Sequence, residues 1–133
     1  MALTADQEQY LREHTLAVLG TGRSDGSPQL SMIIYDYDGN DAVISVTSDR
    51  AKWKNAMRQP NVALLVLDGR KQLIVYGTVE GITETEARNA GTKRIRARMG
   101  RPVEVSDEEL TAELDGNKRV ILKLTPDRAF MND

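Results

Sequence analysis

The sequence predicts an α+β protein whose core is a six-stranded antiparallel β-barrel with short flanking helices, and three observations support this. Six short segments are rich in branched apolar residues, as β-strands are. Asp-Gly pairs, which favour tight turns between antiparallel strands, separate several of these segments. Helical segments do not alternate with the strands as a parallel arrangement would require. The 133 residues and 40% hydrophobic content suit one hydrophobic core, so we expect a single domain over residues 1–133.

The first half of the chain predicts a helix followed by a three-stranded meander. Thr4 and Gln7 have the spacing of a capping box, which favours a helix over Ala5–Glu13. Three β-prone segments follow it: Leu16–Thr21, Gln29–Tyr37 and Ala42–Thr47. The turn residues Ser24–Ser27 and Asp38–Asp41 each contain an Asp-Gly pair and join these strands in sequence order. We expect the helix to close one end of the barrel.

The second half predicts three more strands and three helical segments. A short helix, capped by Ser48 or Asp49, should end before Pro60, because the residue preceding a proline is disfavoured in a helix. The remaining strands are Asn61–Leu67, Gln72–Val79 and Val120–Leu124. Between the last two, Glu84–Gly100 is helical and basic, and Ser106–Glu109 resembles a second capping box.

Composition excludes several classes of function. The chain has no cysteine, which removes disulfides and thiolate chemistry, and His14 is its only histidine, so we predict no metal site. No apolar run approaches the length of about 20 residues that a membrane helix needs. The polar Met1–Arg12 segment does not resemble a signal peptide, so we expect a cytoplasmic protein. The net charge of −2 and the lack of aromatic residues among the cations argue against nucleic acid as a partner.

The junction between the third strand and the following helix gives the clearest functional signal. Cations at Arg50 and Lys52 stand at the start of a helix, where they oppose the helix dipole and would be stabilised by an anion. Both side chains can reach a group held by backbone N–H donors and by the hydroxyls of Thr47 and Ser48. A phosphate site is one interpretation. The other is that Asp49 neutralises the cations and that solvent surrounds them.

A basic run and an acidic run follow each other in the last third of the chain. The cations are Arg88, Lys93, Arg94, Arg96, Arg98 and Arg101, and the acids are Glu104, Asp107, Glu108, Glu109, Glu113 and Asp115. One interpretation is that the two segments pack together and neutralise each other. The alternative is a groove for an acidic ligand tail, with Arg94, Arg96 and Arg98 facing it. The carboxylates elsewhere stand in turns or caps, and we assign no catalytic residue.

Three short motifs occur in a characteristic order: Gly26–Ser31, then Arg50–Lys52 with Asn55, then Gln59–Val66. Their order and spacing resemble the split-barrel superfamily of pyridoxamine-phosphate-oxidase-like proteins, and within it the small branch that uses the deazaflavin coenzyme F420. The resemblance implies a split β-barrel and an F420-dependent oxidoreductase that transfers a hydride to or from a small conjugated organic acceptor. The C-terminal arginine–histidine signature of true pyridoxamine-phosphate oxidases is absent, which argues against that particular activity.

The resemblance also implies cofactor-binding residues. Arg50 and Lys52 would bind the cofactor phosphate, and Thr47 and Ser48 would add hydroxyl and backbone donors. The residues expected to line the deazaflavin ring are Gln29, Ser31, Met32 and Ile33. No proton donor is evident, although Tyr35 and Tyr76 are candidates.

A homodimer is a further implication, because in the family a second chain closes over the ring. The apolar residues expected to serve this contact are Leu64, Val66, Ile74 and Tyr76. Two alternatives to the F420 assignment remain open. The protein could be an FMN-binding split-barrel oxidoreductase, since FMN also offers a phosphate and a tricyclic ring. It could also be a non-enzymatic carrier of flavin or F420.

Overall fold

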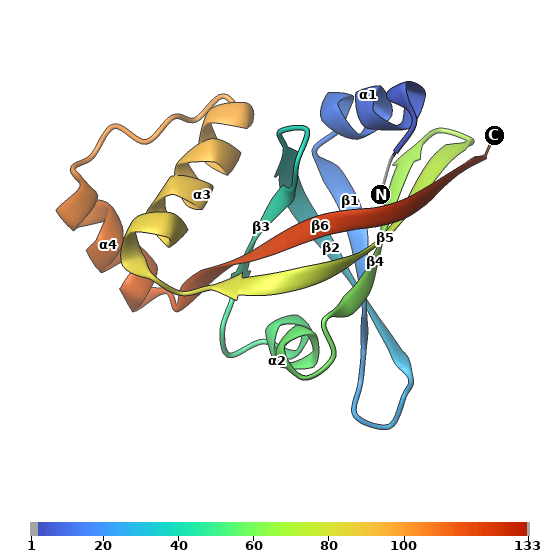
Figure 1. Cartoon of the computed structure of the whole chain (residues 1–133). Coiled ribbons are helices and arrows are strands. Elements are labelled where there is room, and N and C mark those ends of the chain that lie inside the picture. Colours follow the sequence, from blue (N-terminus) through green and yellow to red (C-terminus); the bar gives the residue numbers. More distant parts are fainter. Residues whose placement is uncertain (1–2, 133) are drawn as a thin grey trace.

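The computed structural model describes residues 3–132, so Met1, Ala2 and Asp133, at the ends of the expected domain, lie outside the described part. Six strands form a closed antiparallel barrel in the order β1-β2-β3-β6-β5-β4 (Figure 1). The strands are β1 Leu16–Gly22, β2 Pro28–Tyr37, β3 Ala42–Thr47, β4 Asn61–Asp68, β5 Lys71–Ile82 and β6 Arg119–Asn132. The helices are α1 Ala5–Glu13, α2 Ala51–Arg58, α3 Thr85–Arg98 and α4 Asp107–Gly116. The predicted fold class is confirmed.

Helix α1 closes one end of the barrel, as expected. The side chains of Thr4 and Gln7 form the predicted capping box at its start. The hydroxyl of Tyr10 donates to the Val66 carbonyl oxygen at 3.1 Å, and that of Tyr35 donates to the Leu11 carbonyl oxygen at 2.8 Å. These bonds anchor both sides of the helix to strands, so the helix forms a fixed lid over the barrel interior.

The inner and outer faces of the strands follow the two-residue period of extended chain. Leu64 and Val66 are fully buried inside the barrel, which corrects the expectation that they supply a dimer surface. Residues 63, 65 and 67 of β4 therefore point outward. Ile74 and Tyr76 of β5 do lie on the outer face, where Tyr76 is 37% exposed.

Strand β6 is much longer than the predicted Val120–Leu124 segment. Beyond Leu124, β6 continues to Asn132 and pairs with residues 72–78 of β5, with a bulge at Tyr76/Gly77. A proline at position 126, which has no N–H to donate, conceals this half-strand in the sequence. At the bulge, a Cβ atom on Gly77 would press against the Thr125 backbone, so the glycine allows β5 and β6 to approach.

Helix α3 packs on the outer face of β3 and β6, and α4 lies against α3 (Figure 1). Ile95 is buried against Val43 and Ile121, outside the barrel. At the start of α4, the Ser106 hydroxyl accepts the Glu109 backbone N–H at 3.1 Å, so the predicted helix start is confirmed. No helix within residues 3–132 is both long and apolar enough to span a membrane.

Candidate functional site

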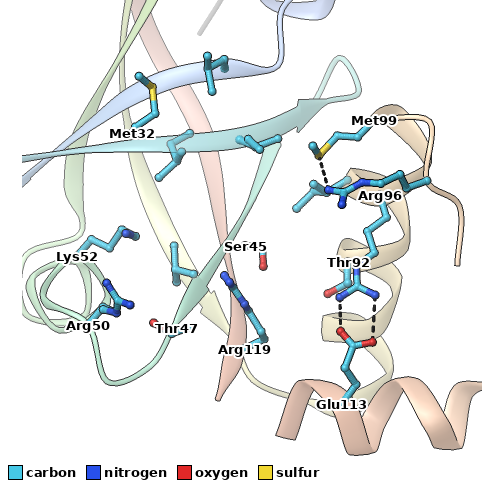
Figure 2. A pocket seen from close by; sticks show the side chains of 16 residues that line it. Met32, Ser45, Thr47, Arg50, Lys52, Thr92, Arg96, Met99, Glu113 and Arg119 are labelled. Carbon is cyan, nitrogen blue, oxygen red and sulfur yellow. Dashed lines mark hydrogen bonds and ion pairs between the residues drawn. The ribbon is translucent and has the colours of Figure 1, made fainter. Parts of the chain in front are cut away.

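A pocket of about 680 Å³ opens between the outer face of β2 and β3 and the side of α3 (Figure 2). One part of its wall is apolar. Met32 and Ile34 of β2 supply one side of this wall, and Ile95 and Met99 of α3 supply the other. The pocket therefore exists because α3 leaves part of the β2–β3 surface uncovered.

The opposite end of the pocket is cationic. Arg50 and Lys52 come from the start of α2, and Arg119 comes from the start of β6 (Figure 2). No described carboxylate lies within ion-pair distance of any of the three. Burial, together with the charges of Arg50 and Arg119, lowers the pKa of Lys52. Three cations that repel one another across a shared space are suited to binding an anion.

The loop before α2 exposes the first turn of that helix to the pocket. Arg50 occupies the N-cap position, which corrects the predicted Ser48 or Asp49 cap. The reason is that the Arg50 N–H donates to the Thr47 carbonyl oxygen at 3.1 Å and the Ser48 N–H to the Lys118 carbonyl oxygen at 2.9 Å, which holds the loop as a turn. No side chain caps α2, so N–H groups of its first turn are free to donate to a ligand.

Asp49 does not neutralise the cations of the pocket. Its carboxylate lies 3.9 Å from the Lys118 ammonium, and it makes no ion pair with Arg50 or Lys52 among the described residues. The neutralising ion pair expected in the interpretation of a solvated cluster is therefore not formed within the described residues.

The pocket brings together five of the eight predicted cofactor residues. These are Met32, Ile33, Thr47, Arg50 and Lys52. Gln29, Ser31 and Ser48 do not line it. The Gln29 side-chain oxygen instead accepts a hydrogen bond from the Asn55 amide at 3.3 Å, which ties α2 to the barrel.

The basic run is used mainly for ion pairs. Three pairs join α3 to the acidic run, as one interpretation predicted: Arg88–Asp115, Lys93–Asp107 and Arg96–Glu113. The side chain of Arg94 donates to Asp36 of β2 at 2.9 Å, and that of Arg98 donates to the Arg12 carbonyl oxygen. A tail groove built from Arg94, Arg96 and Arg98 is therefore wrong, since of these three only Arg96 lines the pocket, together with Arg101 of the same run.

Several pocket residues were missed by the sequence analysis. They come from α3 and β6, and the most informative are Ile95, Met99 and Arg119. Ile95 and Met99 are four residues apart, which is the spacing of an apolar stripe on a helix, so a weak signal was present. Arg119 had no local signal, because its place in the pocket depends on the pairing of β6 with β3.

The pocket offers no neutral acid for proton transfer among the described residues. Glu113 is the one carboxylate that lines it, and the hydrogen bond from Arg96, assisted by the charges of Arg96 and Arg119, lowers its pKa and keeps it ionised. Tyr35 is fully buried in the barrel, where burial raises its pKa. Tyr76 lies on the outer face beside Phe130. Neither tyrosine lines the pocket.

Comparisons with known proteins agree with this fold. A conserved hypothetical protein of Mycobacterium tuberculosis has 21% identity and a TM-score of 0.83 over all of this chain and 86% of its own. An F420 reductase has 25% identity and a TM-score of 0.75 over 96% of this chain and 98% of its own. A heme storage protein from Vibrio cholerae has 15% identity and a TM-score of 0.67 over 98% of this chain and 94% of its own. The sequence profile of the pyridoxamine 5'-phosphate oxidase family matches residues 3–133. The chain therefore belongs to the pyridoxamine 5'-phosphate oxidase family, whose split β-barrel it shares.

Proposed function

We propose that the protein is an F420-dependent oxidoreductase that transfers a hydride between the deazaflavin coenzyme and a small conjugated organic acceptor. The observation that carries the proposal is the pocket, which combines a cationic end with an apolar wall. A cofactor with a phosphate and a flat tricyclic ring matches both parts. The pocket volume of about 680 Å³ also lies in the range of small-molecule sites, which is about 300–1,000 Å³.

In this proposal the residues of the chain bind and orient the cofactor. Arg50 and Lys52 bind the phosphate, with the Thr47 hydroxyl and the first-turn N–H groups of α2 as further donors. Met32 and Ile33 contact the ring. The bound deazaflavin would supply the hydride chemistry, while the protein orients the reactants and excludes water. The binding roles of Gln29, Ser31 and Ser48 stay predictions, and no catalytic acid is assigned.

The F420 reductase with 25% identity over almost its whole length supports F420 as the cofactor. FMN is the main alternative, because it offers a phosphate and a tricyclic ring to the same pocket. A non-enzymatic carrier of either cofactor is the second alternative, favoured by the ionised state of Glu113 and the positions of Tyr35 and Tyr76 outside the pocket.

Fluorescence titration with F420 and with FMN distinguishes the two cofactors. We expect F420 to bind more tightly and the purified protein to lack a yellow flavin spectrum. The reduced deazaflavin should then be oxidised when a quinone or an enone is added with the protein. Tighter binding of FMN would support the FMN alternative, and F420 binding without acceptor reduction would support the carrier.

We also propose a cytoplasmic homodimer whose partner chain covers the ring. Strands β1, β2, β4 and β6 carry large exposed apolar side chains on the outer face of the barrel: Leu16, Leu30, Met32, Leu67 and Phe130. Leu30 and Met32 are 70% and 64% exposed. Met32 belongs both to this face and to the pocket, so a second copy seated on the face would extend to the cofactor.

A further inference from the structure

We infer that Arg119 is a third cationic ligand of the cofactor phosphate and makes the pocket select phosphorylated ligands over their unphosphorylated forms. This inference rests on the proposed cofactor site. Arg119 pairs with Thr47 in the β3–β6 ladder, so both side chains stand on the same face of the sheet. Figure 2 shows the Arg119 side chain in the pocket, between Thr47 and Glu113 in that view.

Within the described part of the chain, Arg119 has no acidic partner, a property that it shares with Arg50 and Lys52 but not with most other cations of α3 and β6. The neighbouring ion pairs are Arg88–Asp115, Lys93–Asp107, Arg94–Asp36, Arg96–Glu113, Lys118–Asp49 and Lys123–Asp41. Within residues 3–132, no carboxylate lies within ion-pair distance of Arg119. A cation that has no acidic partner and lines a pocket is available to a ligand.

The charge of Arg119 acts on both sides of the pocket. It contributes to the lowered pKa of Lys52 on one side and to that of Glu113 on the other. The Glu113 carboxylate is already bound by Arg96, so Arg119 stays free to act with Lys52 and Arg50. An arginine binds phosphate oxygens through a planar pair of N–H donors, whereas the neutral end of an unphosphorylated ligand offers no such partner.

The test compares Arg119→Gln with Lys118→Gln, a matched control. Lys118 precedes Arg119 and carries the same charge, but it pairs with Asp49 and does not line the pocket. We expect Arg119→Gln to weaken FMN and F420 binding by about ten- to a hundredfold. Binding of riboflavin and of the unphosphorylated deazaflavin should not change. Lys118→Gln should leave all four affinities unchanged.

Pyrophosphate has no ring, so thermal stabilisation by pyrophosphate tests the anion site alone. We expect pyrophosphate to raise the melting temperature of the wild type and of Lys118→Gln, and to do so less in Arg119→Gln. Equal losses of FMN and riboflavin binding in Arg119→Gln, or no loss, would overturn the inference. If neither FMN nor F420 binds to the wild type but stabilisation by pyrophosphate depends on Arg119, the proposed function fails and the anion-binding role of Arg119 stands.

Discussion

At the scale of single residues, the cations at one end of the pocket lower the stability of the free protein and raise its affinity for an anionic ligand. Lys52 is half-buried beside Arg50 and Arg119, and its lowered pKa reports that its charged form is disfavoured there. The charged form of Lys52 therefore opposes folding when no anion is bound. An anionic ligand that neutralises the Lys52 charge removes this unfavourable contribution, and the protein therefore binds that ligand more tightly.

Removing the Lys52 charge should separate these two effects. We expect Lys52→Met to raise the melting temperature of the ligand-free protein by about 1–3 °C, because a repelled cation is lost. Cofactor affinity should fall by about ten- to a hundredfold. Lys54→Met is the control, since Lys54 is exposed on α2 outside the pocket. Scanning fluorimetry and cofactor titration give both values, and a lower melting temperature for Lys52→Met would contradict the argument.

The pKa of Lys52 also determines the sign of the pH dependence of cofactor binding. The cationic form binds phosphate, and in the free protein its proton is lost below the ordinary lysine value of 10.5. Affinity should therefore decrease as pH rises, beginning at a lower pH than for an ordinary lysine. A bound anion raises the pKa, so binding in this range should take up a proton, which calorimetry in buffers of different ionisation enthalpy detects. A pH dependence that persists in Lys52→Met would belong to another group.

Glu113 opposes anion binding, because it is the carboxylate that faces the cations of the pocket. Glu113→Gln frees Arg96 and removes a negative charge near Arg119, so FMN affinity should rise by about two- to fivefold. The matched control is Asp107→Asn, which breaks the Lys93 pair between the same helices away from the pocket. Titration in low salt measures the change. An equal rise in both variants would point to net charge instead of the site.

Several of the predicted residues that line the pocket are neighbours along the chain. Thr47, Arg50 and Lys52 lie within one strand–helix junction, where an unfavourable charge at a helix start is visible in the sequence alone. Arg119 lies far along the chain and enters the site only through β3–β6 pairing. The ion-pair partners of the basic run were partly foreseeable. The contact of Arg94 with Asp36 was not, because it depends on where α3 sits on the barrel.

At the scale of secondary-structure elements, local signals identified each strand and helix, and long-range pairing set their lengths. The capping box at Thr4 and the Asp-Gly turns act within a few residues, so they could be read directly. The second half of β6 is stabilised by β5 and not by its own composition. Pro126, which cannot donate a ladder hydrogen bond, gives no local sign that the strand continues.

The β5–β6 bulge gives a prediction about the closed barrel. Gly77→Ala should lower the free energy of unfolding by about 1–3 kcal/mol, because the new Cβ meets the Thr125 backbone and the strands must separate. Gly22→Ala in β1 is the control, since its Cβ would make only an ordinary contact with Gln59 at 3.8 Å. Urea denaturation measures both. Equal stability of the two variants would mean that the bulge relaxes without cost.

At the scale of the whole molecule, the sequence predicted a barrel but not which side of each strand faces outward. The strands of a small barrel alternate between core and surface, and both sets are apolar here in β4. Leu64 and Val66 therefore could not be told from Leu65 and Leu67 by hydrophobicity. The closed strand order also places β3 beside β6, which brings Arg119 to the pocket.

The outer apolar face leads to a prediction about assembly. Leu30 and Phe130 lie on this face, 70% and 49% exposed, and a second copy of the chain would bury them. Leu30→Glu and Phe130→Glu should each convert a dimer into a monomer, because a charge buried at the contact has no partner. Val105→Glu is the control, since Val105 is 48% exposed in the connection between α3 and α4.

Sedimentation velocity at micromolar concentration measures the assembly state, and cofactor titration of the same samples shows whether assembly and binding are linked. Met32 is shared by the face and the pocket, so loss of the dimer should weaken cofactor binding even though Leu30 and Phe130 do not line the pocket. Val105→Glu should remain dimeric with unchanged affinity. A wild-type monomer with full cofactor affinity would show that one chain completes the site, and the apolar face would then need another explanation.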